Sequence, residues 1–371
     1  MKLQKQNFWK TALVCLLIAV VISLGYSIQK TDQKVIQKTD PDLRMKRFGQ
    51  HMEMKQNTPF KELRWQHLGP TNVSGRSTDI AVVTPKGKNY TIYAATASGG
   101  VWKTDNEGTT WEPIFDQGAS TSIGDVTIAP TDDNIIWVGT GEPNIFRSSM
   151  AGSGVYKSTD GGKTWRHMGL TDTHTIARIV IHPQNSDIVY VAASGHEWTD
   201  NEERGVYKST DSGETWRKVL YINERTGAID LVMDPTNPET LYAATWQRIR
   251  LKWNDPRIFE GYKESGVYRT TDGGMNWIPV NNGLPEPKYR GRIGIDLAPS
   301  NPYVIYAFVD NYEISRAADP GEVDSYGRPS SGYIRGATVY RSDDRGQNWR
   351  LMSGQDEEMK GYMEHHSATY G

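Results

Sequence analysis

The feature that most constrains this chain is an eight-residue phrase that recurs five times, about 50–70 residues apart. Each copy has serine or threonine first, aspartate or asparagine third, glycine fifth and tryptophan last. Repeats at such intervals are typical of propeller blades or solenoid coils, in which one supersecondary unit cannot bury its apolar face alone. The copies are TDNEGTTW (104–111), STDGGKTW (158–165), STDSGETW (209–216), TTDGGMNW (270–277) and SDDRGQNW (342–349).

Four strands are predicted in each repeat. A short β-rich run such as GVYKS (154–158) precedes the phrase, and a proline-asparagine turn between two apolar runs, as in IHPQNSDIVYVAA (181–193), precedes that run. Such turns between β-branched, aromatic-rich runs indicate hairpins. Four antiparallel strands make a propeller blade, so the sequence predicts an all-β propeller of four-stranded antiparallel blades. Five blades are visible, and they end near residues 111, 165, 216, 277 and 349.

The recurring phrase has a structural explanation. Its carboxylate accepts hydrogen bonds from amides of its own turn, its glycine takes a positive φ, and its indole covers the neighbouring strands. Asn106 replaces the aspartate in the first copy and makes the same kind of bonds without a charge. We therefore predict structural roles, not catalytic ones, for Asn106, Trp111, Asp160, Trp165, Asp211, Trp216, Asp272, Trp277, Asp344 and Trp349.

Composition excludes several classes of function. Lys plus Arg number 42 and Asp plus Glu 44, so the charge balance does not favour nucleic acid as a partner. Cys15 is the only cysteine, which rules out an internal disulfide and a cysteine-based zinc site. His196 beside Glu197 is too small a set to predict a metal site, and no cofactor motif is present.

The amino terminus predicts export. A basic flank followed by an apolar run from 12 to 22 is typical of a signal peptide, and an uncleaved anchor is the alternative. We assign residues 1–26 to this segment, 27–60 to a polar linker with a short helix starting after Asp40, and 61–371 to the propeller. Either alternative predicts export to the periplasm, the cell surface or the medium. Membrane contact is predicted only through residues 1–26, if this segment is not cleaved.

The recurring phrase resembles the Asp-box, or bacterial neuraminidase repeat. Together with GTGEPN (139–144) and SGHEW (194–198), it makes the chain similar to bacterial relatives of the sortilin propeller, some of which are named glycosyl hydrolases. The resemblance implies a β-propeller that binds a peptide or protein. Because sialidases and xyloglucan-degrading enzymes share the turn, it specifies a fold better than an activity.

The catalytic residues of these enzymes do not carry over. In xyloglucan-degrading relatives a Thr-Asp-x-Gly-Gly phrase of the first blade carries an aspartate base, whereas Ala97 stands at that position here. Arg76, Arg178 and Arg292 fall on predicted innermost strands, as an arginine cluster of sialidases would, but no Arg-Ile-Pro phrase and no tyrosine–glutamate pair accompany them. No catalytic residue is predicted, and enzymatic activity stays open.

Recognition is expected on the face opposite the recurring turns. The loops between the second and third strands lengthen along the chain, at 97–100, 141–154, 194–205, 246–266 and 310–336, and variable loops on a regular scaffold are the usual place for binding. The alternative is that their tryptophans pack the loops themselves and their charges are solvated. The candidate binding residues are Glu142, Asn144, Arg147, His196, Glu197, Trp198, Trp246, Arg248 and Trp253, with the three arginines of the inner strands, Arg76, Arg178 and Arg292.

The sequence thus predicts an exported, sortilin-like binding module for a peptide or protein. A glycoside hydrolase-like or glycan-binding propeller is the alternative. Residues 64–69 resemble the outermost strand of a blade, which predicts either an incomplete ring with further blades or a five-bladed ring with one extra strand.

Overall fold

The computed structural model describes residues 40–63, 76–83, 90–144, 149–247, 249, 264–323, 329, 332–353 and 365–366. The chain divides into two compact units, Met1–Arg44 and Met45–Gly371, and every strand belongs to the second. The predicted export segment, 1–26, and the predicted extra strand, 64–69, lie outside the described residues.

Within the described residues, one α-helix, α2, spans Pro41–Asn57. The Asp40 carboxylate accepts a hydrogen bond from the Asp42 amide at 2.9 Å, and proline at the first helical position needs no donor there. None of its residues is buried. Within the described part of the chain, no helix combines the length and apolar character that crossing a bilayer requires.

The rest of the described chain is an array of five antiparallel sheets, each of which runs in chain order from its innermost to its outermost strand. The prediction of an all-β fold of four-stranded blades is confirmed. The blades are β1 (Ser77–Val82), β2 (Ile92–Thr96), β3 (Val101–Thr104) and β4 (Glu112–Pro113); β5 (Ile123–Ala129), β6 (Asp132–Thr140), β7 (Val155–Ser158) and β8 (Arg166–His167); β9 (Ile176–Ile181), β10 (Val189–Ala193), β11 (Gly205–Ser209) and β12 (Arg217–Leu220); β13 (Thr226–Met233), β14 (Leu241–Gln247), β15 (Gly266–Thr270) and β16 (Ile278–Pro279); β17 (Arg290–Leu297), β18 (Ile305–Arg316), β19 (Tyr333–Ser342) and β20 (Arg350–Leu351).

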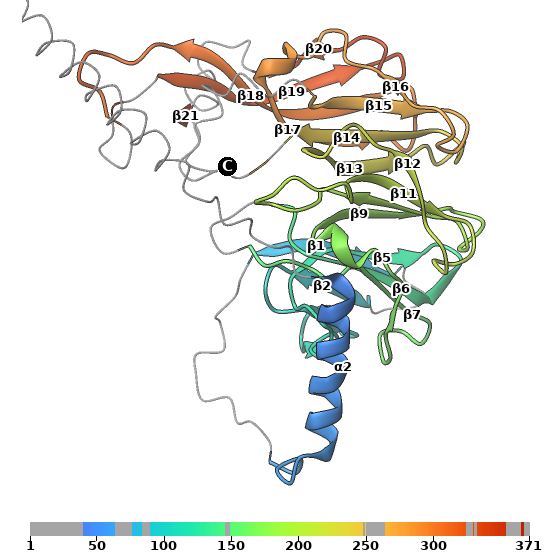
Figure 1. Ribbon diagram of the computed structural model, residues 1–371. Coiled ribbons are helices and arrows are strands. Elements are labelled where there is room, and N and C mark those ends of the chain that lie inside the picture. The colour runs from blue at the N-terminus through green and yellow to red at the C-terminus, as the bar shows by residue number, and fades with distance from the viewer. Residues whose placement is uncertain are drawn as a thin grey trace, which may run out of the picture. The chain divides into compact units, whose positions relative to one another are not determined.

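Neighbouring blades pack face to face in chain order. The innermost strands β1, β5, β9, β13 and β17 each contact the next one, and Figure 1 shows these blades in colours from light blue to orange. The fourth strand of every blade begins directly after the tryptophan of the recurring phrase. Because strands alternate in direction, the recurring turns lie at one end of the blades, here called the turn face, and the loops between second and third strands lie at the other, the loop face.

An aromatic residue at one register position of the second strand closes each blade against the following one. Tyr93, Trp137, Tyr190 and Tyr242 are at most 2% exposed. The Tyr190 hydroxyl donates to the Gly273 carbonyl of the next blade's turn at 3.0 Å. Burying an aromatic side chain in this way is a large hydrophobic gain, so these residues form the main interior of the blade interfaces.

The outer sheet faces of the first and fifth blades carry exposed apolar side chains. Tyr306 holds the equivalent position in β18 and is 38% exposed, while Phe308 beside it is 53% exposed. At the other end, Ile80 of β1 is 60% exposed. Among the described residues, these two outer sheet faces are therefore open to solvent at the positions that are buried between blades elsewhere.

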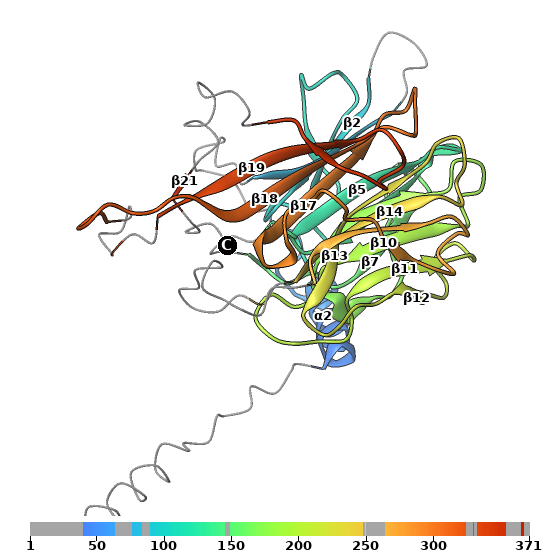
Figure 2. The same ribbon diagram turned by 90° about the horizontal axis from the view of Figure 1, so that it is seen from above.

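The last blade corrects one expectation. Residues 310–336 were expected to form the longest loop, but β18 and β19 continue to pair from Asp310 with Ala337 as far as Arg316 with Tyr333. The hairpin runs past the strands of the other blades (Figure 2). A two-residue strand, β21 (His365–His366), pairs with the extended part of β19. Alternating buried and exposed residues along β18 explain why this segment is a strand.

Candidate functional site

The five recurring turns have nearly identical geometry. In the second blade, the Asp160 carboxylate accepts hydrogen bonds from the Lys163 amide at 3.0 Å and from the amide and hydroxyl of Thr164 at 2.9 and 2.6 Å. These bonds, with the Thr164 hydroxyl first, lower the pKa of Asp160 to about 2. In the first blade, Asn106 accepts the amide of Thr110 and donates its own NH₂ to the hydroxyl of the same residue. All acceptor sites serve the turn itself, which is a structural role.

The tryptophans that end the turns tie successive blades together. Trp165, Trp216 and Trp349 donate their indole N–H groups to the main-chain carbonyls of Ile114, Met168 and Val280 at 2.8, 2.7 and 2.9 Å. Each of these carbonyls belongs to the residue that directly follows the fourth strand of the preceding blade. The turn face is therefore held by links between blades.

At the loop face, charged residues of the innermost strands meet in what we call the axial cluster: Asp79, Asp125, Arg178 and Asp230. These residues hold equivalent register positions of β1, β5, β9 and β13, each next to a register shift against the second strand of its blade. The Arg178 guanidinium lies 3.4 Å from Asp79, 3.2 Å from Asp125 and 3.3 Å from Asp230. One side chain of the third blade thus bridges the first, second and fourth blades.

The same carboxylates also link neighbouring strands. Asp79 accepts a hydrogen bond from the Val126 amide of β5, Asp125 from the Ile179 amide of β9, and Asp230 from the Ile295 amide of β17, at 3.1, 3.1 and 2.9 Å. Asp125 is fully buried, and burial together with the nearby Asp79 charge raises its pKa to about 7 despite Arg178. A group so enclosed cannot reach a ligand.

Two further contacts surround the axial cluster. Arg76 binds the buried Glu142 with both ends of its guanidinium, at 2.7 and 2.5 Å. Arg292 of the fifth blade donates to the side-chain oxygen of Asn144 in the second blade. Contacts between blades that are far apart in sequence show that the blades turn their inner edges toward a common axis, as in a propeller and unlike a linear stack.

The structure thus brings together Arg76, Glu142, Asn144, Arg178 and Arg292 from the predicted binding residues. Arg76 and Arg178 form ion pairs with carboxylates of the protein itself. In a sialidase-like arginine cluster, the guanidinium groups would instead bind a carboxylate of the ligand. Arg292 is different, because it donates to a neutral amide, that of Asn144, and burial lowers its pKa.

Ala97 lies next to this group. Its amide donates to the Arg76 carbonyl at 2.9 Å, and its side chain is buried. The position that carries an aspartate base in xyloglucan-degrading propellers is thus at the loop face but offers no proton acceptor.

A second group of predicted residues lies on the loop of the third blade. His196 and Glu197 are buried, whereas Trp198 is 54% exposed. Trp246, at the end of β14, is 8% exposed and contributes to the interior instead of the surface. Arg147, Arg248 and Trp253 lie outside the described residues.

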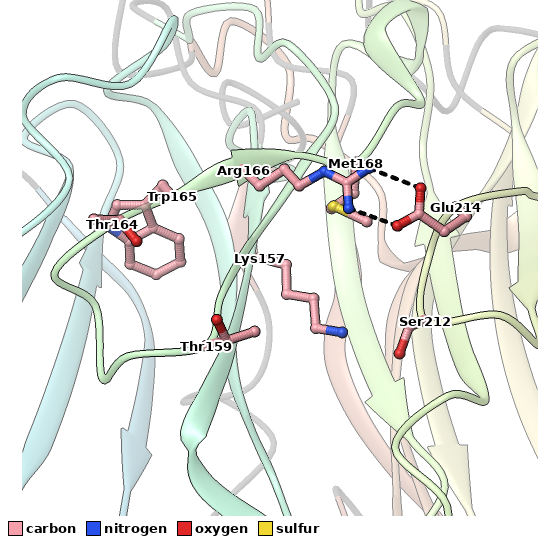
Figure 3. A pocket seen from close by; sticks show the side chains of 8 residues that line it. All are labelled: Lys157, Thr159, Thr164, Trp165, Arg166, Met168, Ser212 and Glu214. Carbon is pink, nitrogen blue, oxygen red and sulfur yellow. Dashed lines mark hydrogen bonds and ion pairs between the residues drawn. The ribbon is translucent and has the colours of Figure 1, made fainter.

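A cavity of about 260 Å³ opens elsewhere, at the turn face between the second and third blades (Figure 3). Arg166 and Glu214 bridge it by an ion pair of 2.6 Å, and Lys157 and Ser212 line it. Ligand sites usually enclose about 300–1,000 Å³. Since an ion pair spans this smaller space, we regard it as a gap between two blades.

Sequence reasoning missed the acidic members of the axial cluster. Asp125, Arg178 and Asp230 each stand five residues before the proline of the recurring proline-asparagine turn, so their alignment was visible in the sequence. Asp172 and His174, which lie beside His196, come from the preceding connection between blades and had no such signal.

Comparison with known proteins agrees with this architecture. A family model described as "Sortilin, neurotensin receptor 3" matches residues 153–304, which contain the third and fourth blades. Xyloglucanase Xgh74A of Acetivibrio thermocellus is 26% identical over 211 residues, covering 51% of this chain and 24% of that protein. A xyloglucanase of a Paenibacillus species is 24% identical over 252 residues, covering 62% of this chain and 23% of that protein.

A solved structure is similar in fold. The crystal structure of an ancestral GH74 enzyme superposes with a TM-score of 0.54 at 24% sequence identity, covering 79% of this chain and 33% of that one. The chain spans about a quarter of the length of the curated relatives it matches. The chain is therefore similar to the propellers of sortilin-type and xyloglucan-degrading proteins.

Proposed function

We propose that this chain is an exported Asp-box propeller that binds a glycan of the xyloglucan class on its loop face without cleaving it. The observation that carries the proposal is that polar side chains of several blades converge at the loop-face end of the inner strands, where the Arg76 and Arg178 side chains are 40% and 39% exposed, in a chain whose curated relatives are named xyloglucanases. This proposal follows the glycan alternative of the sequence analysis, because the curated relatives favour it over peptide binding.

The proposed lack of cleavage rests on the two carboxylates that glycoside hydrolysis requires. Ala97 replaces the aspartate base, and Asp125, whose pKa of about 7 would suit a general acid, is fully buried. An acid must reach the glycosidic oxygen to protonate it. Hydrogen-bonding groups and an exposed indole remain, which suffice for binding.

Binding of xyloglucan oligosaccharides by isothermal titration calorimetry tests this proposal. We expect Trp198→Ala to weaken binding about 10-fold or more, because exposed tryptophans are common anchors of ligands. Trp111→Ala is the matched control, since that indole is 41% exposed on the turn face. A reducing-sugar assay run in parallel should detect no hydrolysis.

The sortilin family match supports a second candidate, a peptide-binding propeller. The same titration with a set of extended peptides separates the two. Binding of peptides without binding of oligosaccharides would replace our proposal with the peptide candidate, and release of reducing ends would replace it with an enzyme.

A further inference from the structure

Three side chains that bind transition metals meet at the loop face of the third blade. Asp172 lies in the 3₁₀ turn η1 (Thr171–Thr173) between β8 and β9, His174 follows it, and His196 comes from the loop after β10. Their ligand atoms all lie within 4.8 Å of one another. The Asp172 carboxylate oxygen Oδ1 is 3.8 Å from His174 Nε2 and 3.5 Å from His196 Nε2.

These separations suit a tetrahedral ion. Zinc binds nitrogen and carboxylate oxygen at about 2.0–2.2 Å, so two ligands of a tetrahedral site lie about 3.3–3.6 Å apart. The two Asp172 distances exceed this range by at most about 0.5 Å, and the nearly parallel histidine rings, 14° apart, would turn so that both nitrogen lone pairs point at one ion. Two imidazoles and one carboxylate also leave a fourth position for water or a ligand. Because the His174 side chain is 26% exposed while Asp172 and His196 are buried, an ion can enter from the His174 side.

The loop around His196 is held in place by buried polar groups. Arg204 is 1% exposed and donates to the carbonyls of Ser194 at 2.6 Å and Thr199 at 3.2 Å, as well as to that of His196. The Asn201 side chain accepts the His196 amide at 2.9 Å. A ligand that its surroundings hold in this way gives a preorganised site.

His174 is fixed on the other side. Its carbonyl accepts a hydrogen bond from the Gly152 amide at 2.7 Å, and its ring stacks on that of His196 with centroids 3.6 Å apart and an angle of 14°.

We propose that Asp172, His174 and His196 form a binding site for a divalent transition-metal ion, with Zn²⁺ as the best fit. His196 Nε2 lies 3.0 Å from the Asp172 carbonyl, and Nδ1 lies 2.9 Å from the Thr199 hydroxyl. On binding, the ring proton moves from Nε2 to Nδ1, the ion takes its place on Nε2, and the Thr199 hydroxyl turns from donor to acceptor. The ring neither gains nor loses a proton in this exchange.

Calorimetric titration of the chelator-treated full chain with ZnCl₂ at pH 7.5 tests the site, together with the thermal midpoint with and without Zn²⁺. We expect one tightly bound ion per chain and a higher midpoint in its presence. His174→Ala should weaken this binding at least about 100-fold, since loss of a supporting group alone costs about 10–100-fold. Asp172→Asn, which keeps the shape of the side chain, should weaken it as well.

Control variants separate this site from other histidines. His182→Gln, between β9 and β10, and the double variant His365→Gln/His366→Gln should both keep the tight site. Circular dichroism shows whether each variant is folded. If His174→Ala does not fold, the Zn²⁺ affinity of Asp172→Asn decides the test. Absence of Zn²⁺ binding by the wild-type chain, or equal binding by the folded ligand variants, would overturn the proposal.

Discussion

At the scale of single residues, the recurring turn shows how a motif can be diagnostic of fold without marking a catalytic site. Asp160, Asp211 and Asp272 are partly exposed carboxylates, yet each has a pKa of about 2, because a hydroxyl or amide donor of its own turn stabilises the charged form. All these donors lie within four residues of the carboxylate, so the sequence alone predicted the role. Asn106 of the first blade provides a natural comparison.

The turn carboxylates should make the fold sensitive to acid. Since the folded pKa of Asp160 lies below its value in the unfolded chain, its contribution is complete above about pH 4 and is lost as the pH falls toward 2. Asp160→Asn keeps an acceptor and should reduce the loss of thermal stability between pH 4 and pH 2. The reciprocal variant, Asn106→Asp, should increase that loss. Thermal unfolding followed by circular dichroism at the two pH values measures both, and equal acid sensitivity of all three proteins would refute the assignment.

At the scale of strands and blades, the inner-strand carboxylates act as links that local sequence does not reveal. The sequence predicted the strands and the position of the loop face, because these follow from alternation and turn residues. It did not predict that Arg178 bridges Asp79, Asp125 and Asp230, because those contacts join residues 52 to 99 positions apart. It also placed a loop at 310–336 where β18 and β19 continue as a hairpin, because length alone does not separate a loop from extended strands.

Asp125 should give the protein a stability profile opposite to that of the turns. Its folded pKa of about 7 lies above the unfolded value, so its contribution is complete below about pH 4 and is lost as the pH rises through 7. Asp125→Asn retains the oxygen that accepts the Ile179 amide. The free energy of unfolding of the variant minus that of wild type should be roughly 2–4 kcal/mol larger at pH 8 than at pH 5. Urea unfolding at both pH values measures this difference. The raised pKa would be contradicted if the free energy of unfolding of wild type rises from pH 5 to pH 8 while that of Asp125→Asn stays the same.

At the scale of the whole propeller, the two ends of the blades serve different purposes. The turn face uses its indoles and carboxylates for contacts within and between blades, while the loop face gathers side chains from different blades near one axis. A regular scaffold with variable loops at one end lets binding residues change without disturbing the links at the other. The sequence could place the candidate residues on one face, but only the fold shows that Trp246 is buried and that Arg76 and Glu142 are partners.

Hydrogen–deuterium exchange of the full chain, with and without a saturating xyloglucan oligosaccharide, tests this division of the two faces most directly. Glycan binding at the loop face predicts slower exchange in peptides that contain Glu142–Asn144 and His196–Trp198, with unchanged exchange in the turns at 104–111, 158–165 and 209–216. Slower exchange confined to the turns, with unchanged exchange in the loop-face peptides, would contradict it.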